Sequence, residues 1–595
     1  MPTIIKGRIE ALRALMAQRK VSAYIIPSSD AHLSEYVPGR WKARQWISGF
    51  TGSAGTVVVT ASKAGLWTDS RYFLQAAGQL EGSGIELYKS GLPETPSIED
   101  FLLYELKEGD TAALDGQTYS AAAAQALEAK LAAKGVALDI SEDLIDKIWN
   151  DRPPVPGHAI FELPVELSGQ TVSGKLDAIN DKLHEAGADG LLLCALDEIA
   201  WTFNIRGNDV EYNPVAVSYA YISENESVLF IPPGKLAPET AQHLKEAGVT
   251  LADYNKTASY ISRLPAQTCL FVDKHKTNAA LFKAIPEHCR IIEGLTPANR
   301  LKSIKNATEI AGFKNALVKD GIALTRFYIW LEKQLAEGAR VTEMGLAAKL
   351  SSLRAGQPLY VSDSFATICG YASHGAIVHY SATPETDAEI RPEGILLMDS
   401  GAQYLDGTTD ITRTIALSEP TEAMRKDFTR VLKGHISLAK CKFPAGTRGS
   451  QLDILARKAL WDAGINYLHG TCHGIGHCLN VHEGPQSIRM EENPVVLEAG
   501  MVMSNEPAMY RTNEYGIRTE NMIVVREDSE TEYGKFLSFE TLTLCCIDVR
   551  LIIVQMLSAR EHAWLNKYHQ MVYETLAPHL SPEEQEWLKD KTKFI

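Results

Sequence analysis

Apolar positions along the first half of the chain form a pattern that occurs twice. In the first copy, the apolar run SAYIIPS is followed by Asp30, a helix, the glycine turn FTGSAG and two strands that end in GLWTDSRYF. In the second copy, the run GLLLCAL leads to Asp197, the segment DEIAWTFNIRG and the strands AVSYAYI and SVLFIPP. Short apolar runs bounded by turn residues are typical of strands. The repeated order predicts two related α/β domains.

The second half of the chain begins with a different pattern. From residue 302 onward, the stretch SIKNATEIAGFKNALVKDGIALTRFYIWLEKQL has the apolar spacing of a long amphipathic helix. Alternating strands and glycine turns follow, and the chain returns to helix from Ser558. The first twenty residues, MPTIIKGRIEALRALMAQRK, also predict an amphipathic helix. Mixed helical and strand patterns of this kind predict an α/β or α+β catalytic domain.

Two segments separate these regions. The proline-rich stretch 150–164 lies between the two copies, where a linker is expected. A second boundary falls near 297–304. A chain of 595 residues is too long for one core. We therefore expect two N-terminal α/β domains at 1–152 and 153–301, and a catalytic domain with a helical extension at 302–595.

Composition excludes some classes of partner. The 59 basic and 74 acidic residues give a net charge of −15, which opposes binding to nucleic acid. No apolar run of about 18 residues predicts a membrane span, and the N-terminal segment lacks the uninterrupted apolar region of a secretory signal. The nine cysteines are scattered without a C-x-x-C pair, as in proteins of a reducing compartment. We expect a cytoplasmic protein that contacts neither nucleic acid nor membrane.

Acidic residues end two apolar strands of one predicted hairpin. In GILLMDSGAQYLDGTTDITRTIAL, Asp399 and Asp410 lie on either side of a turn signal at Asp406-Gly407. Because the two aspartates are symmetric about the middle of the hairpin, cross-strand pairing would place their carboxylates within about 5 Å of each other. Taken alone, an aspartate at a strand end is most often a turn or cap residue.

A second segment, GMVMSNEPAMYRTNEYGIRTENMIVV, repeats this plan. Glu506 ends one strand, Pro507 to Gly516 form the turn, and Glu520 lies in the mirror position on the return strand. Four converging carboxylates would repel by roughly a few kcal/mol per close pair at an effective dielectric constant near 20. Two divalent cations would neutralise them. A site that is mostly carboxylate favours Mn²⁺, with Zn²⁺ or Co²⁺ as alternatives.

The imidazole for such a site is expected between the hairpins. The segment YLHGTCHGIGHCLNVHEGP holds four histidines within 14 residues: His469, His473, His477 and His482. A glycine-rich turn with surface imidazoles would explain this segment equally well in isolation. The mirrored acidic pairs on either side of it favour a metal site.

In order and context, these residues resemble the metal ligands of the pita-bread metallopeptidases, namely Asp399, Asp410, His473, Glu506 and Glu520. The phrases DSGAQYLDGTTDITRT, EYGIRTEN, WISGFTGSAGTVVVT and WTDSRYF are most similar to the long, cytosolic, three-domain X-prolyl aminopeptidases, and the likeness extends over the whole chain. The resemblance implies two creatinase-like N-terminal domains, a pita-bread catalytic domain, a homodimer, and peptide substrates with proline at the second position.

The resemblance also implies how the ligands are shared. Asp399 binds one metal ion, Asp410 and Glu520 bridge the two ions, and His473 and Glu506 complete the second. A hydroxide that bridges two cations is available as a nucleophile near neutral pH. Glu506 is then expected to act catalytically by moving a proton from that nucleophile to the leaving nitrogen.

Further residues match substrate-binding positions of the family. His379 and His482 correspond to histidines that contact the scissile peptide and stabilise its tetrahedral intermediate, which makes both catalytic. His469 and Arg518 correspond to supporting positions in the active site, and Arg71 to a substrate-contacting arginine of the N-terminal domain. Without the resemblance, His379 would be interpreted as a strand histidine and Arg71 as half of a surface ion pair.

Two departures from the family pattern stand next to ligands. Cys472 precedes His473 where glycine is common, and Ala508-Met509 follow Glu506-Pro507 where glycine and tyrosine are usual. Neither departure removes a ligand, but either can change the wall of the pocket, and Cys472 can make the site sensitive to oxidants or soft metals.

Two alternatives remain open, and several other classes of enzyme find little support. A prolidase, which cleaves X-Pro dipeptides, would use the same five ligands. A catalytically silent pita-bread scaffold is the alternative from another class. Serine hydrolases, zincins and P-loop proteins lack their usual motifs here, and the glycine run at 49–55 precedes a strand, which is the wrong order for a dinucleotide site.

Overall fold

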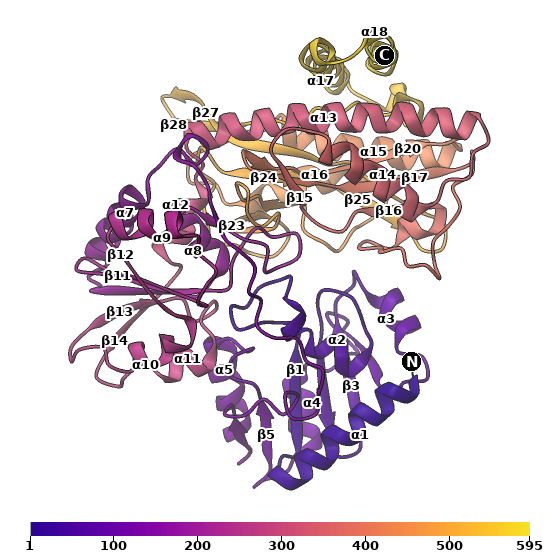
Figure 1. Cartoon of the computed structure of the whole chain (residues 1–595). Coiled ribbons are helices and arrows are strands. Elements are labelled where there is room, and N and C mark those ends of the chain that lie inside the picture. The colour runs from indigo at the N-terminus through magenta and orange to yellow at the C-terminus, as the bar shows by residue number, and fades with distance from the viewer. Residues whose placement is uncertain (1) are drawn as a thin grey trace. The chain divides into compact units, whose positions relative to one another are not determined.

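The computed structural model describes residues 2–595 and divides into two compact units. The N-terminal unit comprises Met1–Leu163 and Gln170–Asn299, and the C-terminal unit comprises Pro164–Gly169 and Arg300–Ile595. Each unit has its own sheets (Figure 1). Each also has its own hydrophobic clusters.

The N-terminal unit contains two six-stranded sheets with the same strand order. The first has the order β4-β3-β2-β1-β5-β6 and the second β12-β11-β10-β8-β13-β14. In both sheets the second, third and fourth strands pair antiparallel, and all other pairs are parallel. The prediction of two related α/β domains is confirmed.

Of the twelve strands in these sheets, β1, β2, β3, β8, β10 and β11 fall on the predicted apolar runs, and the other six were not predicted. The first sheet contains β1 (Ala23–Pro27), β2 (Thr56–Thr60), β3 (Ala64–Thr68), β4 (Glu86–Lys89), β5 (Thr111–Leu114) and β6 (Ala137–Asp139). The second contains β8 (Gly190–Leu193), β10 (Tyr219–Ser223), β11 (Ser227–Ile231), β12 (Val249–Asp253), β13 (Cys269–Val272) and β14 (Arg290–Glu293).

Helices cover both faces of the first sheet. Val57 and Val59 of β2 pack in one apolar cluster with helix α1 (Pro2–Arg19), whereas Val58 points to the other face. Side chains alternate along a strand, so a continuous apolar run is buried on both sides. The other helices of this unit are α2 (Ala43–Ser48), α3 (Phe73–Gln79), α4 (Ile98–Glu105), α5 (Ala121–Ala132), α7 (Val172–Ala186), α8 (Leu196–Thr202), α9 (Pro238–Glu246), α10 (Thr257–Ile261) and α11 (Ala279–Lys283).

Several smaller sheets and a long helix make up the C-terminal unit. The sheets have the orders β21-β28-β27-β24-β22-β23, β16-β17-β20, β15-β18-β19 and β25-β26. Their strands are β15 (Tyr360–Asp363), β16 (Ile368–Tyr371), β17 (Ile395–Ser400), β18 (Ala402–Tyr404), β19 (Gly407–Thr408), β20 (Ile411–Ala416), β21 (Lys442–Pro444), β22 (Cys472–Gly474), β23 (Glu483–Ile488), β24 (Val502–Asn505), β25 (Ala508–Arg511), β26 (Tyr515–Arg518), β27 (Asn521–Thr531) and β28 (Gly534–Thr541).

The long helix is α13 (Ala307–Ala336), and it fixes one end of the predicted aspartate hairpin. Asn306 and Glu309 form a capping box at its first turn, which explains why the helix begins there. At Gly312, a Cβ atom would meet the backbone oxygen of Asp406 at 2.3 Å, so helix and hairpin turn are in backbone contact. Lys319 adds an ion pair of 2.5 Å to the Asp406 carboxylate.

The remaining helices complete this unit. They are α6 (Val165–Ser168), α12 (Pro297–Ser303), at the boundary between the units, and α14 (Glu343–Ala355), α15 (Glu422–Ala439), α16 (Asp453–Trp461), α17 (Ala559–Leu576) and α18 (Pro582–Lys591). Figure 1 shows α17 and α18 next to α13, and the predicted return to helix at the C-terminus is confirmed. Within the described part of the chain, no helix has both the length and the apolar character needed to cross a bilayer.

Candidate metal centre

The first acidic hairpin has a register different from the predicted one. Asp399 of β17 lies opposite Thr412 of β20, not opposite Asp410. The reason lies in the turn, where Tyr404 pairs with Gly407 and shifts the centre of the hairpin by one residue. The prediction of direct pairing is therefore wrong. Asp410 precedes Thr412 by two residues, so it follows the same face of the strand and its carboxylate lies diagonal to Asp399.

The second acidic hairpin agrees with the predicted mirror arrangement. Asn505 pairs with Asn521, and Ala508 pairs with Arg518, so Glu506 and Glu520 occupy corresponding positions between the two strand pairs. The predicted turn over 507–516 is wrong, because β25 and β26 extend the hairpin through that range. Apolar residues of these two strands belong to the buried core, which explains why they pair as strands.

Three potential ligands converge from three strands or strand ends. Asp410, His473 and Glu520 each offer an atom within 4.8 Å of the others. Nε2 of His473 lies 3.3 Å from Oδ2 of Asp410 and 3.6 Å from Oε1 of Glu506. The other ring nitrogen of His473, Nδ1, is 2.9 Å from the carbonyl oxygen of Gly474. That contact holds the proton on Nδ1 and leaves Nε2 to face the carboxylates.

Asp399 is anchored by one oxygen only. Arg518 donates a hydrogen bond of 2.6 Å to Oδ2 of Asp399 and one of 3.0 Å to Oγ1 of Thr412. Oδ1 of Asp399 is buried and has no hydrogen-bond partner among the described residues. A buried carboxylate oxygen without a donor is costly. The residues therefore fit a bound cation, because a cation at this position would satisfy Oδ1.

The electrostatics of the cluster lead to the same conclusion. Burial raises the pKa of Glu506 to about 7, and the neighbouring carboxylates of Asp410 and Asp399 add to this. Burial and nearby carboxylates also raise the pKa of Asp399 and that of Glu520 above their ordinary values. Like charges in a low-dielectric site cannot all ionise without compensation. Protons or bound cations must supply it, and the donor set of carboxylates with one imidazole suits borderline divalent ions.

Two further predicted histidines lie beside this cluster. The ring of His482 is 4.5 Å from the ring of His473, centroid to centroid, and nearly perpendicular to it at 80°. Nδ1 of His469 lies 3.9 Å from Oε2 of Glu506, and Nε2 lies 2.9 Å from the hydroxyl of Tyr510. His379 lies in a turn after the short helix Ala372–Ala376, not in a strand as the alternative interpretation supposed. Its role stays a prediction.

Tyr510 and Thr412 belong to the site but carry no role in the sequence-based prediction. The Tyr510 hydroxyl lies 2.6 Å from Arg518 and thereby links the arginine to His469. Thr412 donates a hydrogen bond of 2.7 Å to Oε2 of Glu520. The position of Thr412 on the same strand face as Asp410 was the signal for its role. No local pattern indicates Tyr510, because its partners are eight or more residues away.

The departures from the family pattern are buried. Ala508 and Met509 are at most 2% exposed, and Met509 packs in the core. Cys472 is 3% exposed, and burial followed by the nearby Glu506 carboxylate raises the pKa of its thiol well above the ordinary value. Because the thiolate is the reactive form, this position does not favour the expected sensitivity to oxidants.

Arg71 lies in the N-terminal unit, beside a polar pocket. Its guanidinium donates two hydrogen bonds of 2.8 Å to the Asp69 carboxylate. Arg71 is therefore half of an ion pair, which is the alternative that the sequence analysis gave for it. The next residue, Tyr72, lies 2.6 Å from the hydroxyl of Ser53, which lines the pocket. A substrate-binding role for Arg71 stays a prediction.

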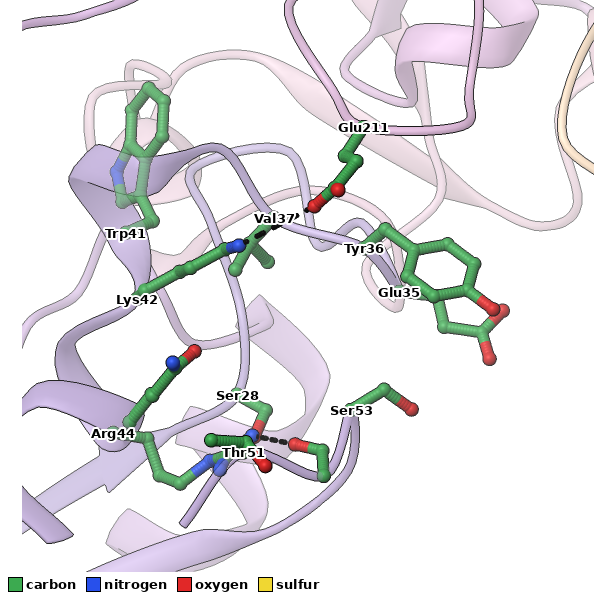
Figure 2. Close-up of a pocket in the computed structure, with 12 residues that line it drawn as sticks. Ser28, Glu35, Tyr36, Val37, Trp41, Lys42, Arg44, Thr51, Ser53 and Glu211 are labelled. Carbon is green, nitrogen blue, oxygen red and sulfur yellow. Dashed lines mark hydrogen bonds and ion pairs between the residues drawn. The ribbon is translucent and has the colours of Figure 1, made fainter. Parts of the chain in front are cut away.

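The pocket itself has a volume of about 170 Å³ and is lined mostly by polar side chains (Figure 2). Lys42 and Glu211 form an ion pair of 3.7 Å at one side, and Nε of Arg44 donates to Ser28 at 2.7 Å on another. Such a lining can hold a small polar group, and its position beside Tyr72 places it next to the segment that carries Arg71.

Models of known protein families match most of the chain. Residues 8–148 and 151–309 each match the Creatinase/Prolidase N-terminal domain, residues 311–527 match metallopeptidase family M24, and residues 535–595 match the C-terminal region of peptidase M24.

Individual proteins match over nearly the whole length. The chain is 42% identical over 603 residues to the Drosophila melanogaster protein named Xaa-Pro aminopeptidase ApepP, with 98% of each chain covered. A Caenorhabditis elegans crystal structure, described as X-prolyl aminopeptidase, a cytosolic enzyme with a di-nuclear active site, has a TM-score of 0.95 and 36% identity, and covers 99% of this chain and 100% of that one. The Xaa-Pro dipeptidase from Bacillus anthracis is 24% identical with a TM-score of 0.50, covers 63% of this chain and 98% of that one, and shows likeness of fold alone.

Proposed function

Because the chain belongs to the Xaa-Pro aminopeptidases of metallopeptidase family M24, we propose that it removes the first residue from peptides whose second residue is proline. The fold is the predicted one, with two creatinase-like N-terminal domains followed by a pita-bread catalytic domain. For the domain boundaries, the proposal keeps the divisions at 152/153 and 301/302.

The observation that carries the proposal is the buried Oδ1 of Asp399, which lacks a donor beside a cluster of further carboxylates. Five residues would hold two divalent cations, and their donor set favours Mn²⁺ over Zn²⁺ or Co²⁺. When bound, such ions lower the pKa of water and polarise a carbonyl group. The residues that would hold these ions are Asp399, Asp410, His473, Glu506 and Glu520.

The remaining chemistry belongs to side chains of this chain. Glu506 accepts the proton of the attacking water and returns it to the leaving nitrogen. His482 and His379 donate hydrogen bonds to the carbonyl oxygen as it gains charge. Arg518 and His469 both contact the Tyr510 hydroxyl and support the active site through it. Arg71, in the N-terminal domain, contacts the substrate.

The substrate explains why the leaving group needs a proton from the enzyme. The nitrogen of an X-Pro bond is tertiary and carries no hydrogen, so it cannot donate to a binding pocket before cleavage. It becomes a secondary amine only after it receives a proton. Glu506, whose Oε1 lies 3.6 Å from Nε2 of His473 at the centre of the cluster, is placed to pass that proton on.

The proposed setting is the cytoplasm, as a homodimer. The structure has nine free cysteines and no disulfide among the described residues, which is consistent with a reducing compartment. Peptides are the only proposed binding partners, and the net charge of −15 gives no support for nucleic acid.

The experiment compares a dipeptide with a tripeptide after metal removal. Chelation should abolish release of arginine from Arg-Pro-Pro, and Mn²⁺ should restore it, with two ions per chain by elemental analysis. A restored protein that prefers Gly-Pro over Arg-Pro-Pro would show that the chain is a prolidase. A protein that binds no stoichiometric metal and cleaves neither peptide would be a silent scaffold.

A further inference from the structure

Glu483, the first residue of β23, is a fully buried carboxylate in the C-terminal unit. Nζ of Lys302 lies 2.6 Å from its Oε2, and Nζ of Lys305 forms an ion pair with its Oε1. The side chains of both lysines are 1% exposed. Nζ of Lys305 also donates a hydrogen bond of 2.8 Å to the carbonyl oxygen of Lys302. Three buried charged groups therefore meet at this point.

Stability alone is a poor reason for such a cluster. Removing charged groups from water costs several kcal/mol per ion, and well-packed apolar residues of the same volume are often as stable or more stable. A buried ion cluster does fix the relative position of the segments that carry it, because each charge must stay within hydrogen-bond reach of its partner. The segments fixed here are the one that carries Glu483 and the one that carries the two lysines.

One of these segments carries His482. Glu483 follows His482 directly, and across the paired strands it lies opposite Gly474, the neighbour of His473. Glu483 is tightly packed against two glycines. A Cβ on Gly474 would lie 2.5 Å from the carbonyl oxygen of Glu483, and a Cβ on Gly476 would lie 3.1 Å from Oε2 of Glu483. The start of β23 is thus held by its side chain and its backbone together.

The other segment is the stretch 302–305, which leads into α13. Its backbone is anchored to the strands of the metal site: the amide of Lys305 donates a hydrogen bond of 3.0 Å to Gly500, and Ile304 forms an isolated bridge with Met501. Met501 directly precedes β24, the strand that leads to Glu506. The lysines therefore connect the segment of His482 to the strand that leads to Glu506, a proposed ligand.

We propose that Lys302 and Lys305, through Glu483, are positioning residues that hold the His482 imidazole against His473 in the orientation needed to meet the peptide carbonyl. None of the three belongs to the proposed ligand set. The inference rests on the proposed function, because it concerns how His482 is placed for that reaction.

The test uses Lys302→Met in the full-length, Mn²⁺-loaded protein. This variant leaves Glu483 with its ion pair to Lys305, and circular dichroism and gel filtration check that the fold is retained. The kcat for Arg-Pro-Pro should fall by about tenfold or more, while KM changes by less than about threefold and two metal ions per chain remain. Lys302→Arg keeps the cation and should recover most of the kcat. Lys305→Met is the second variant and should give the same pattern.

A matched control separates this effect from loss of any ion pair. Lys314 of α13 pairs with Glu540 at 2.6 Å on the surface. Lys314→Met should show unchanged kcat and KM, because an exposed pair contributes little and positions nothing at the site.

A double variant decides whether Lys302 acts through His482. On a His482→Ala background, Lys302→Met should lower kcat by less than about twofold further. If the two losses multiply in the double variant, or if Lys302→Met has a normal kcat while the wild type is active, this inference is overturned and the proposed function is not. A Mn²⁺-loaded wild type that does not cleave Arg-Pro-Pro overturns the proposed function and the inference with it.

Discussion

Arg518 donates a hydrogen bond of 2.6 Å to one oxygen of Asp399, and the other oxygen of that carboxylate is buried without a partner among the described residues. The arginine thereby holds one oxygen of the carboxylate and leaves the second oxygen buried without a donor. A guanidinium can do this because its planar donors also reach Thr412 and Tyr510 at the same time.

The first prediction concerns this arrangement. Arg518→Lys keeps the charge but offers a single ammonium group that cannot bond Asp399, Thr412 and Tyr510 together. We expect activity toward Arg-Pro-Pro to fall by about tenfold to a hundredfold, with weaker metal retention during dialysis. Steady-state kinetics and metal analysis check both. Wild-type kinetics in this variant would show that the bonding pattern of Arg518 is not needed.

The second prediction concerns the proposed bridging aspartate. Asp410→Asn removes one negative charge and changes the donor set at the point where Asp410, His473 and Glu520 converge. We expect the variant to lose metal and activity together and to keep its fold, as judged by circular dichroism and gel filtration. Full activity with two bound ions would refute the bridging role.

The third prediction links metal removal to pH. The folded-state pKa of Glu506 is raised to about 7 from 4.5, so its protonated form stabilises the metal-free fold fully below about pH 4.5, and that contribution is lost as pH rises through 7. Burial lowers the pKa of His473, but the contact with Asp410 outweighs this effect and raises the pKa to about 9. His473 therefore also stabilises the metal-free fold less as pH rises. For Glu506 the loss is roughly 3 kcal/mol.

Calorimetry at pH 5 to 8, with and without Mn²⁺, measures this effect. The unfolding temperature of the metal-free protein should fall relative to the loaded protein as pH rises, because cations bind the deprotonated carboxylates and replace the protons. Parallel curves for the two forms would contradict the proposed charge balance.

The fourth prediction concerns Cys472. Burial raises the pKa of its thiol well above the ordinary value, so little thiolate is present at neutral pH. Native protein treated with iodoacetamide at pH 7.5 should remain unmodified at Cys472, whereas protein unfolded in urea should react fully. Mass spectrometry of the tryptic peptides distinguishes the two. Rapid modification of native protein would show that the segment around His473 opens.

The positions of the acidic residues relative to strands were predictable. Glu506 and Glu520 were predicted in mirror positions, and the structure places them opposite each other between the two strand pairs of the hairpin. The same symmetry argument gave the wrong partner for Asp399, because the turn at Tyr404 and Gly407 is displaced by one residue. The displaced turn is held by contacts of Asp406 with α13, a helix about 90 residues earlier in the chain.

The sequence by itself determined the elements and the chemistry: two copies of an α/β pattern, a long amphipathic helix after residue 302, and an order of acids and histidine that resembles one metallopeptidase family. These are local features, since periodicity and side-chain type are properties of short segments. Only the tertiary structure decided that Arg518 anchors Asp399 and that Lys302 holds Glu483, pairs separated by 119 and 181 residues. Contacts of that range depend on how whole strands and helices pack, and no local propensity encodes them.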